Sequence, residues 1–190
     1  MPGMNDKKAP IDRIEKVSFH RVQTNQQKQQ AGALIREYLA WLNERVKDEY
    51  GLEFDIEAMI ESDLTDPAKF EPPDGRFHLV YYRGEVAGVG CLRKLTEHVG
   101  EIQRMYVPEI FRGRGIGRAI VERLIDDARS IGYHKLRLES LEFLTAAHSL
   151  YRSVGFREIV PYADNSMRSY QLEETLDRYY AIMLFMEMDL

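Results

Sequence analysis

"RMYVPEIFRGRGIGRAIVERLI", residues 104–125, joins a strand-like run to a helix-like run through a loop rich in glycine and arginine. Two arginines and three glycines occupy the six positions from Arg112 to Gly117, and Arg118 follows directly. Glycines at a helix start let a ligand reach the main chain, whose first N–H groups lack intrahelical partners and whose dipole favours an anion. Arginine side chains add charge-assisted hydrogen bonds to phosphate oxygens. The stretch therefore predicts a local anion site, with phosphate as its natural ligand.

The residues on either side of this loop predict a parallel β-α-β unit. Upstream, Glu101 to Val107 has the pattern of a strand. Downstream, apolar residues recur every four positions from Ile116 to Ala128, with charged residues on the opposite side, which is typical of an amphipathic helix that ends at Gly132. Leu136 and Leu138 then alternate with charged residues as a short strand. A strand, crossover helix and strand in one sheet form a right-handed parallel unit.

The rest of the chain supplies helices and antiparallel strands. Two apolar stripes predict helices over Gln26–Tyr50 and Ile56–Leu64, and two β-rich runs, Phe77–Tyr82 and Val86–Leu92, flank "RGE" as a hairpin. A further helix is predicted over residues 147–154, and "AIMLFMEMDL" at residues 181–190 fits a closing strand. We therefore expect an α/β (α+β) fold with a mixed, mostly antiparallel sheet, a central parallel β-α-β unit and flanking helices.

Length and composition favour one soluble domain. The chain of 190 residues is long enough to bury a core, and 44% apolar with 30% charged residues is ordinary for a globular protein. Residues 1–16 are polar without a sustained period, so we expect a disordered leader before a single domain over residues 17–190. No run approaches the roughly 18 apolar residues of a membrane span, and no secretory signal is evident, which predicts a cytoplasmic protein without membrane contacts.

Charge and cysteine content exclude several classes of site. A net charge of −5 argues against a broad nucleic-acid-binding face, so a phosphate site must be local. Cys91 is the only cysteine and lies in an apolar run, which predicts a core residue in a reducing compartment and excludes a disulfide framework. The five histidines lack metal-ligand spacing, so we expect no metal.

Three kinds of phosphate-binding loop compete for the glycine-arginine stretch. A P-loop needs a Gly-Lys-Ser/Thr run after its first glycine, and the sequence has none. A dinucleotide fingerprint needs GxGxxG, but its last glycine position holds Arg118 when counted from Gly113 and Ile120 when counted from Gly115. Glu139 does imitate the acid that holds a ribose in that fingerprint. The glycine register nevertheless favours the third pattern, R-x-x-G-x-G.

That pattern, written as Arg112, Gly115 and Gly117, is preceded by "MYV" at residues 105–107 and followed by "AAHSLYRSVGFREI" at residues 146–159. In this order and spacing the sequence resembles the GNAT superfamily of acetyl-CoA-dependent N-acetyltransferases, over roughly residues 77–161. The resemblance implies that the loop cradles the pyrophosphate of coenzyme A, mostly through main-chain N–H groups. The residues implicated are Arg112, Gly113, Arg114, Gly115, Ile116, Gly117 and Arg118.

The resemblance also implies a mechanism. The strand Met105, Tyr106, Val107 pairs through its backbone with the pantetheine arm, and Tyr151 protonates the departing thiolate. Glu101 is expected to take the proton of the amine, directly or through water. The acetyl group then passes from acetyl-CoA straight to a primary amine of a small molecule, amino acid or peptide within a ternary complex.

Some positions depart from the pattern. Leu144 stands where relatives often have an asparagine, which removes a polar contact and leaves a non-catalytic acyl-CoA sensor or assembly domain as the alternative function. The segment after Pro161 is longer than in many relatives, and such additions tend to line the acceptor site. Four of its residues are therefore candidates for substrate contacts, with a solvated helix as the alternative: Tyr162, Asp164, Arg168 and Tyr170. His148, one turn before Tyr151, is a further candidate for the acceptor side. Homodimers are common in the superfamily, and the sequence shows no specific interface.

Overall fold

The protein is described by a computed structural model over residues 17–162 and 175–190, so the expectation for residues 1–16 lies outside the described residues. Its strands form one sheet in the order β1-β2-β3-β4-β5-β7-β6. The strands are β1 (Val17–Arg21), β2 (Arg76–Tyr82), β3 (Glu85–Lys94), β4 (Val99–Tyr106), β5 (Lys135–Leu141), β6 (Arg157–Ile159) and β7 (Met183–Asp189). The helices are α2 (Asn25–Tyr50), α3 (Ile56–Thr65), α4 (Pro67–Phe70), α5 (Ile116–Ile131), α6 (Thr145–Ser153) and α7 (Leu176–Ala181), with a 3-10 turn η1 (Glu109–Phe111).

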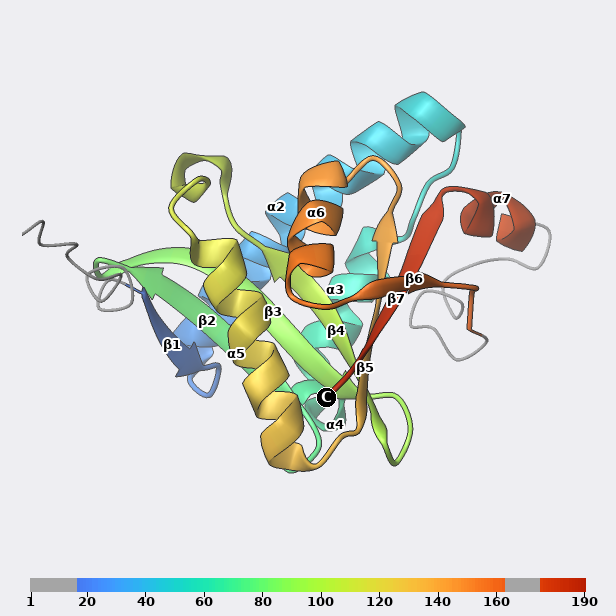
Figure 1. Cartoon of the computed structure of the whole chain (residues 1–190). Coiled ribbons are helices and arrows are strands. Elements are labelled where there is room, and N and C mark those ends of the chain that lie inside the picture. Colours follow the sequence, from blue (N-terminus) through green and yellow to red (C-terminus); the bar gives the residue numbers. More distant parts are fainter. Residues whose placement is uncertain (1–16, 163–174) are drawn as a thin grey trace, which may run out of the picture.

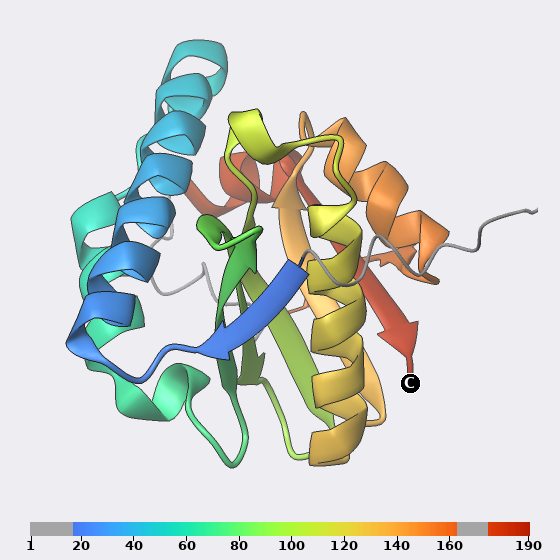
Figure 2. The same ribbon diagram turned by 90° about the vertical axis from the view of Figure 1, so that its left-hand side faces the viewer.

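The helices lie on both faces of the sheet. Helix α5 crosses one face beside α6, and α2 with α3 covers the opposite face (Figures 1 and 2). Each face has its own apolar core, one built on α5 and one built on α2 and α3. Cys91 is fully buried in the sheet, which confirms that it is a core residue.

The strand pairing confirms a mixed, mostly antiparallel sheet. Strands β1 to β4 pair antiparallel in sequence order, and β5 pairs antiparallel with β7. The parallel contact is short, because β4 pairs with β5 only from Val99↔Lys135 to Glu101↔Arg137, while both strands continue beyond it. The sheet therefore has a point at which its two central strands part.

Strand β1 was not predicted from the sequence. Its five residues, VSFHR, pair along their whole length with β2, from Val17↔Tyr82 to Arg21↔His78. The run is too short and too polar to stand out by periodicity, and its pairing depends on the sheet edge that β2 offers.

Helix α2 begins at a capping box in which Thr24 and Gln27 satisfy each other's backbone N–H groups. Most of the glutamine-rich segment, residues 25–30, thus forms the first turns of the helix. Its buried stripe includes Leu34, Ile35 and Leu39 and faces the sheet. The predicted helix is confirmed with a start one residue earlier than expected.

A bulge in β4 interrupts its pairing with β3. Val89 pairs with Tyr106 and Cys91 with Gln103, so two residues of β4, Arg104 and Met105, stand opposite one residue of β3. Arg104 takes a φ of +50°, a left-handed conformation that is uncommon for a non-glycine residue. The bulge redirects side chains next to the point where β4 leaves β5.

Helix α5 approaches β3 closely at Gly90. A Cβ at this position would lie 2.6 Å from Ile120 Cγ2 and 3.3 Å from Leu124 Cδ1, and both side chains are fully buried. We expect Gly90→Ala to lower the free energy of unfolding by about 1–3 kcal/mol, because added volume in a packed core forces neighbours to move. Denaturant unfolding measures this effect, with Ser130→Ala on the exposed side of α5 as the control; equal stability of the two variants would contradict the packing described.

Candidate active site

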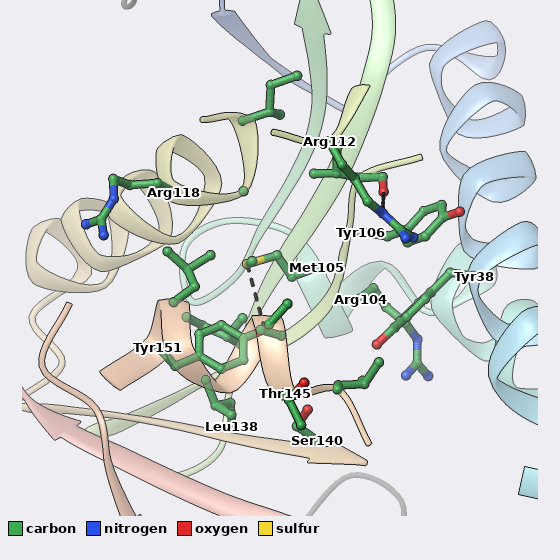
Figure 3. Close-up of a pocket in the computed structure, with 18 of the residues that line it drawn as sticks. Tyr38, Arg104, Met105, Tyr106, Arg112, Arg118, Leu138, Ser140, Thr145 and Tyr151 are labelled. Atoms are coloured by element: carbon green, nitrogen blue, oxygen red, sulfur yellow. Dashed lines mark hydrogen bonds between the residues drawn. The ribbon is translucent and has the colours of Figure 1, made fainter. Parts of the chain in front are cut away.

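A cavity of about 600 Å³ opens where β4 and β5 part (Figure 3). Its walls come from both strands, from the loop before α5, from α6 and from α2. The lining includes most of the residues predicted to bind coenzyme A, together with Tyr151: Met105, Tyr106, Val107, Arg112, Gly113, Gly115, Ile116, Gly117 and Arg118. Residues far apart in sequence thus meet around one space.

The glycine-arginine loop presents main-chain groups to this cavity. Gly113 and Gly115 take φ values of +74° and +82°, and a Cβ on either would meet nothing within 4 Å. These glycines are therefore required by conformation, and the space beside them is open to a ligand. Gly115 is the N-cap of α5, and no side chain of the described residues caps that helix start. Its first-turn N–H groups are available to an anion.

The three arginines of the loop differ in where they point. Arg112 lines the cavity, donates from Nε to the carbonyl of Val107 at 3.1 Å and lies over the ring of Trp41. Arg118 also lines the cavity and donates to Ser153 Oγ at 2.7 Å. Arg114 does not line it, because its guanidinium donates to the carbonyl of Ile110 and lies over Tyr82. Arg112 and Arg118 therefore meet at the cavity, and Arg114 does not.

Tyr151 projects from α6 into the cavity, opposite β4 (Figure 3). Its side chain is 7% exposed, its ring packs 5.8 Å from that of Phe156, and its hydroxyl lies 3.9 Å from Met105 Sδ. Burial raises the pKa of the Tyr151 hydroxyl above its ordinary value, so the phenol stays protonated at neutral pH. The same apolar surroundings disfavour a thiolate as they disfavour a phenolate, so burial raises both pKa values and leaves the direction of proton transfer from phenol to thiolate largely unchanged.

Glu101 is fully buried and does not line the cavity. Arg93 Nε and Gln103 Nε2 each donate to its carboxylate at 2.6 Å, and the Tyr162 hydroxyl donates at 2.7 Å. The structure therefore does not place Glu101 beside a substrate, although Gln103 connects it to the cavity wall. A relayed role for Glu101 stays a prediction.

Several cavity residues were missed by sequence reasoning. Tyr38 and Trp41 of α2 line the cavity, and the Tyr38 ring stacks 5.0 Å from that of Tyr106. Burial raises the pKa of Tyr38 to about 12. Burial, followed by a hydrogen bond to Glu37, raises the pKa of Tyr106 to about 12. In the sequence, Tyr38 belongs to the apolar stripe of α2, and this pattern is equally typical of a residue in the hydrophobic core.

A second cavity of about 80 Å³ adjoins the first on the α2 and α3 face. Six residues line both cavities and so form the boundary between them: Tyr38, Ile102, Gln103, Arg104, Glu139 and Ser140. Arg104 and Glu139 are the charged members of this boundary. Glu139 accepts a hydrogen bond from the Tyr179 hydroxyl at 2.8 Å, and Arg104 is paired with Asp63 of α3.

The remaining sequence candidates fall into three groups. His148 is buried, makes a 3.0 Å hydrogen bond with Ser140 Oγ and does not line the cavity; burial lowers its pKa, so it is neutral. Leu144 does line the cavity and caps α6 without a side-chain hydrogen bond. Tyr162 lies outside the cavity lining, on Glu101. Asp164, Arg168 and Tyr170 lie outside the described residues.

Within residues 17–162 and 175–190, no three His, Cys, Asp or Glu side chains are grouped so that they could hold a metal ion. The helices of the same ranges include none with the length and apolar character that crossing a membrane requires.

The geometry of the cavity agrees with the known proteins that this chain resembles. Residues 34–156 match the Acetyltransferase (GNAT) family. An IAA acetyltransferase of Azospirillum brasilense is 37% identical over 100 residues, 52% of this chain and 65% of that protein. An uncharacterized N-acetyltransferase of Escherichia coli (strain K12) is 31% identical over 120 residues, 60% of this chain and 72% of that protein. An N-acetylaspartate synthetase of Rattus norvegicus is 32% identical over 107 residues, 55% of this chain but only 36% of that protein.

Solved structures show the same fold. An acetyltransferase of the GNAT family from Staphylococcus aureus superposes with a TM-score of 0.67 at 18% identity, covering 92% of this chain and 99% of that one. A GNAT family acetyltransferase from Elizabethkingia anophelis, solved with acetyl-CoA bound, gives a TM-score of 0.58 at 20% identity, with 93% and 99% covered. Because the family match spans well over half of the residues and the sheet has the mixed topology expected of it, this chain belongs to the GNAT family of acetyltransferases.

Proposed function

We propose that this protein transfers an acetyl group from acetyl-CoA directly to a primary amine, with both substrates bound together. The observation on which this depends is the shared cavity, in which an uncapped helix start and Tyr151 face one space between β4 and β5. A diphosphate fits the uncapped helix start, and a leaving thiolate fits beside the Tyr151 hydroxyl.

The loop residues supply the grip on the cofactor end of the substrate. Main-chain N–H groups from Gly113 to Gly117 donate to the pyrophosphate oxygens, with Arg112 and Arg118 adding charge from the cavity wall. The free edge of β4 beyond Glu101 leaves backbone groups of Met105 to Val107 without a β5 partner, so the pantetheine amides pair there. This positions the thioester between β4 and α6.

The chemical step balances with one acid and one base. The ammonium first gives one proton to a base, and the neutral amine then attacks the thioester carbonyl carbon. A C–N bond forms and the C–S bond breaks while Tyr151 gives its hydroxyl proton to the sulfur. The nitrogen loses its second proton as the amide forms, and that proton returns to the Tyr151 phenolate. Glu139 is the carboxylate that lines both cavities, and we place the accepting group for the amine proton there. Cys91 takes no part, because it is fully buried and burial raises the pKa of its thiol well above its usual value.

The test is release of free coenzyme A thiol from acetyl-CoA in the presence of a panel of primary amines. We expect amine-dependent release and no radioactive label on the protein when it is denatured after incubation with labelled acetyl-CoA. Label that stays with the denatured chain would contradict the direct route. Absence of amine-dependent release, despite tight coenzyme A binding, would favour a sensor.

A further inference from the structure

The boundary between the two cavities contains a buried acceptor atom without a donor. Gln103 is 6% exposed, and among the described residues its Oε1 has no hydrogen-bond partner. The amide orientation is fixed, because Nε2 donates to the Glu101 carboxylate at 2.6 Å and only the nitrogen end can do so. An unsatisfied buried oxygen that lines both cavities calls for a donor from a ligand.

Glu139 lies across the gap from this oxygen. The parallel pairs run from Val99↔Lys135 to Glu101↔Arg137, and continuing that register by two residues sets Gln103 opposite Glu139. The two strands no longer pair at this level, and both side chains line the two cavities. An amide oxygen and a carboxylate on two sides of a gap match an ammonium or amine group, which brings several N–H donors.

The neighbouring residue on β4 brings positive charge to the same boundary. Arg104 and Lys69 both pair with Asp63, at 2.5 Å and 2.6 Å, and their side chains are 8% and 12% exposed. In the described part of the chain, Asp63 is the single carboxylate within salt-bridge distance of either cation. One negative charge thus serves two buried positive charges, and Arg104 lines both cavities. Because buried charges are stabilised by opposite charges, this arrangement favours an anionic group on the ligand.

The second cavity itself is small and apolar. Apart from the boundary residues and Tyr179, its walls are aliphatic, aromatic or thioether side chains: Leu39, Leu42, Phe54, Ile56, Met59, Leu141 and Met183. At about 80 Å³ it has room for an aliphatic group of a few carbon atoms, given that a 150 Å³ cavity accepts a benzene ring. A charged side chain placed there would lose its hydration without compensation.

We propose that the acceptor is a free α-amino acid with a small apolar side chain. Its amino group binds between Gln103 Oε1 and Glu139, its carboxylate pairs with Arg104, and its side chain enters the second cavity. This inference rests on the proposed transferase function, since it names the amine of that reaction. It places the nitrogen at the boundary with the larger cavity, on the side where the thioester is expected.

A matched pair of acceptors isolates the role of the carboxylate. 3-Methylbutylamine is leucine without its carboxyl group, so we compare kcat/KM for L-leucine and for this amine by coenzyme A thiol release. A hydrogen-bonded charge pair predicts a preference for leucine of about 10- to 100-fold. L-Aspartate is expected to be the poorer amino acid, because its second carboxylate would enter the apolar cavity. Equal values for leucine and the amine would overturn the carboxylate site, and a preference for aspartate would overturn the apolar one.

Variants test the assignment to Arg104. Arg104→Gln should bring the leucine-to-amine ratio close to one, and Arg104→Lys should restore part of it. Arg129→Gln, an exposed arginine on α5 that pairs with Asp126, serves as the control and should keep the wild-type ratio. Because the ratio compares two acceptors on one preparation, a fraction of unfolded protein does not change it. An unchanged ratio in Arg104→Gln would contradict the proposal.

Equilibrium binding separates this inference from the proposed reaction. Calorimetric titration of wild-type protein in the presence of coenzyme A should show tighter binding of leucine than of 3-methylbutylamine. If neither acceptor releases thiol while leucine still binds more tightly, the transferase proposal fails and the amino-acid site stands. If thiol release proceeds with other amines and leucine neither binds nor reacts, the amino-acid site fails alone.

Discussion

Tyr151→Phe is expected to lower kcat by about 10²- to 10⁴-fold, the usual contribution of a general acid or base. The substitution removes the proton that the departing sulfur needs. It leaves the aromatic ring, which packs against Phe156 on the α5 face of the sheet. Coenzyme A affinity should change little, because among the described residues the hydroxyl has only the weak contact to Met105 Sδ.

The measurement is steady-state thiol release at saturating substrates, with the dissociation constant of coenzyme A determined separately. Tyr133→Phe is the matched control: Tyr133 is also a buried tyrosine, but its hydroxyl donates to the Asp74 carbonyl at 2.7 Å, away from the cavity. A Tyr151→Phe enzyme with wild-type kcat would show that another group protonates the sulfur.

Replacing Arg112 and Arg118 by alanine is expected to weaken coenzyme A binding by about 100-fold. Hydrogen bonds to charged groups contribute roughly 1.5–3 kcal/mol each, and these two side chains are exposed, so the lower end applies: about tenfold for each arginine. Their effect should diminish at high salt because ions screen exposed charges.

Arg114→Ala supplies the control for that pair. Arg114 belongs to the same loop and has the same charge, but its guanidinium is directed to Ile110 and Tyr82, outside the cavity. Calorimetry should therefore find coenzyme A affinity within a few-fold of wild type. A loss with Arg114→Ala equal to that of the double variant would mean that the loop acts only through its overall charge.

The β-α-β unit could be predicted because its signals are local. The apolar period of α5, the glycines before it and the alternation in β5 each lie within one element, and the topology then follows from the handedness of crossover connections. The anion site before α5 could be predicted for the same reason, since backbone conformation and helix polarity depend on adjacent residues. Its assignment to coenzyme A through Arg112, Gly115 and Gly117 came from the resemblance to the family.

The acceptor side could not be predicted, because it depends on contacts between distant elements. The bulge at Arg104 arises from the pairing of β4 with β3, and only that bulge, with Asp63 of α3, brings the guanidinium to the cavity boundary. Glu101 has the same chemistry as Glu139, and the sequence could not tell which carboxylate lines the cavity. The fold answers this, since Glu101 lies in the last paired register of β4 and β5 and Glu139 lies beyond it.

The most direct measurement is a crystal structure of the protein with coenzyme A. The account predicts the diphosphate within hydrogen-bond distance of main-chain N–H groups between Gly113 and Gly117, with the thiol between β4 and the Tyr151 hydroxyl. A nucleotide bound elsewhere on the protein, or a thiol directed away from Tyr151, would contradict it.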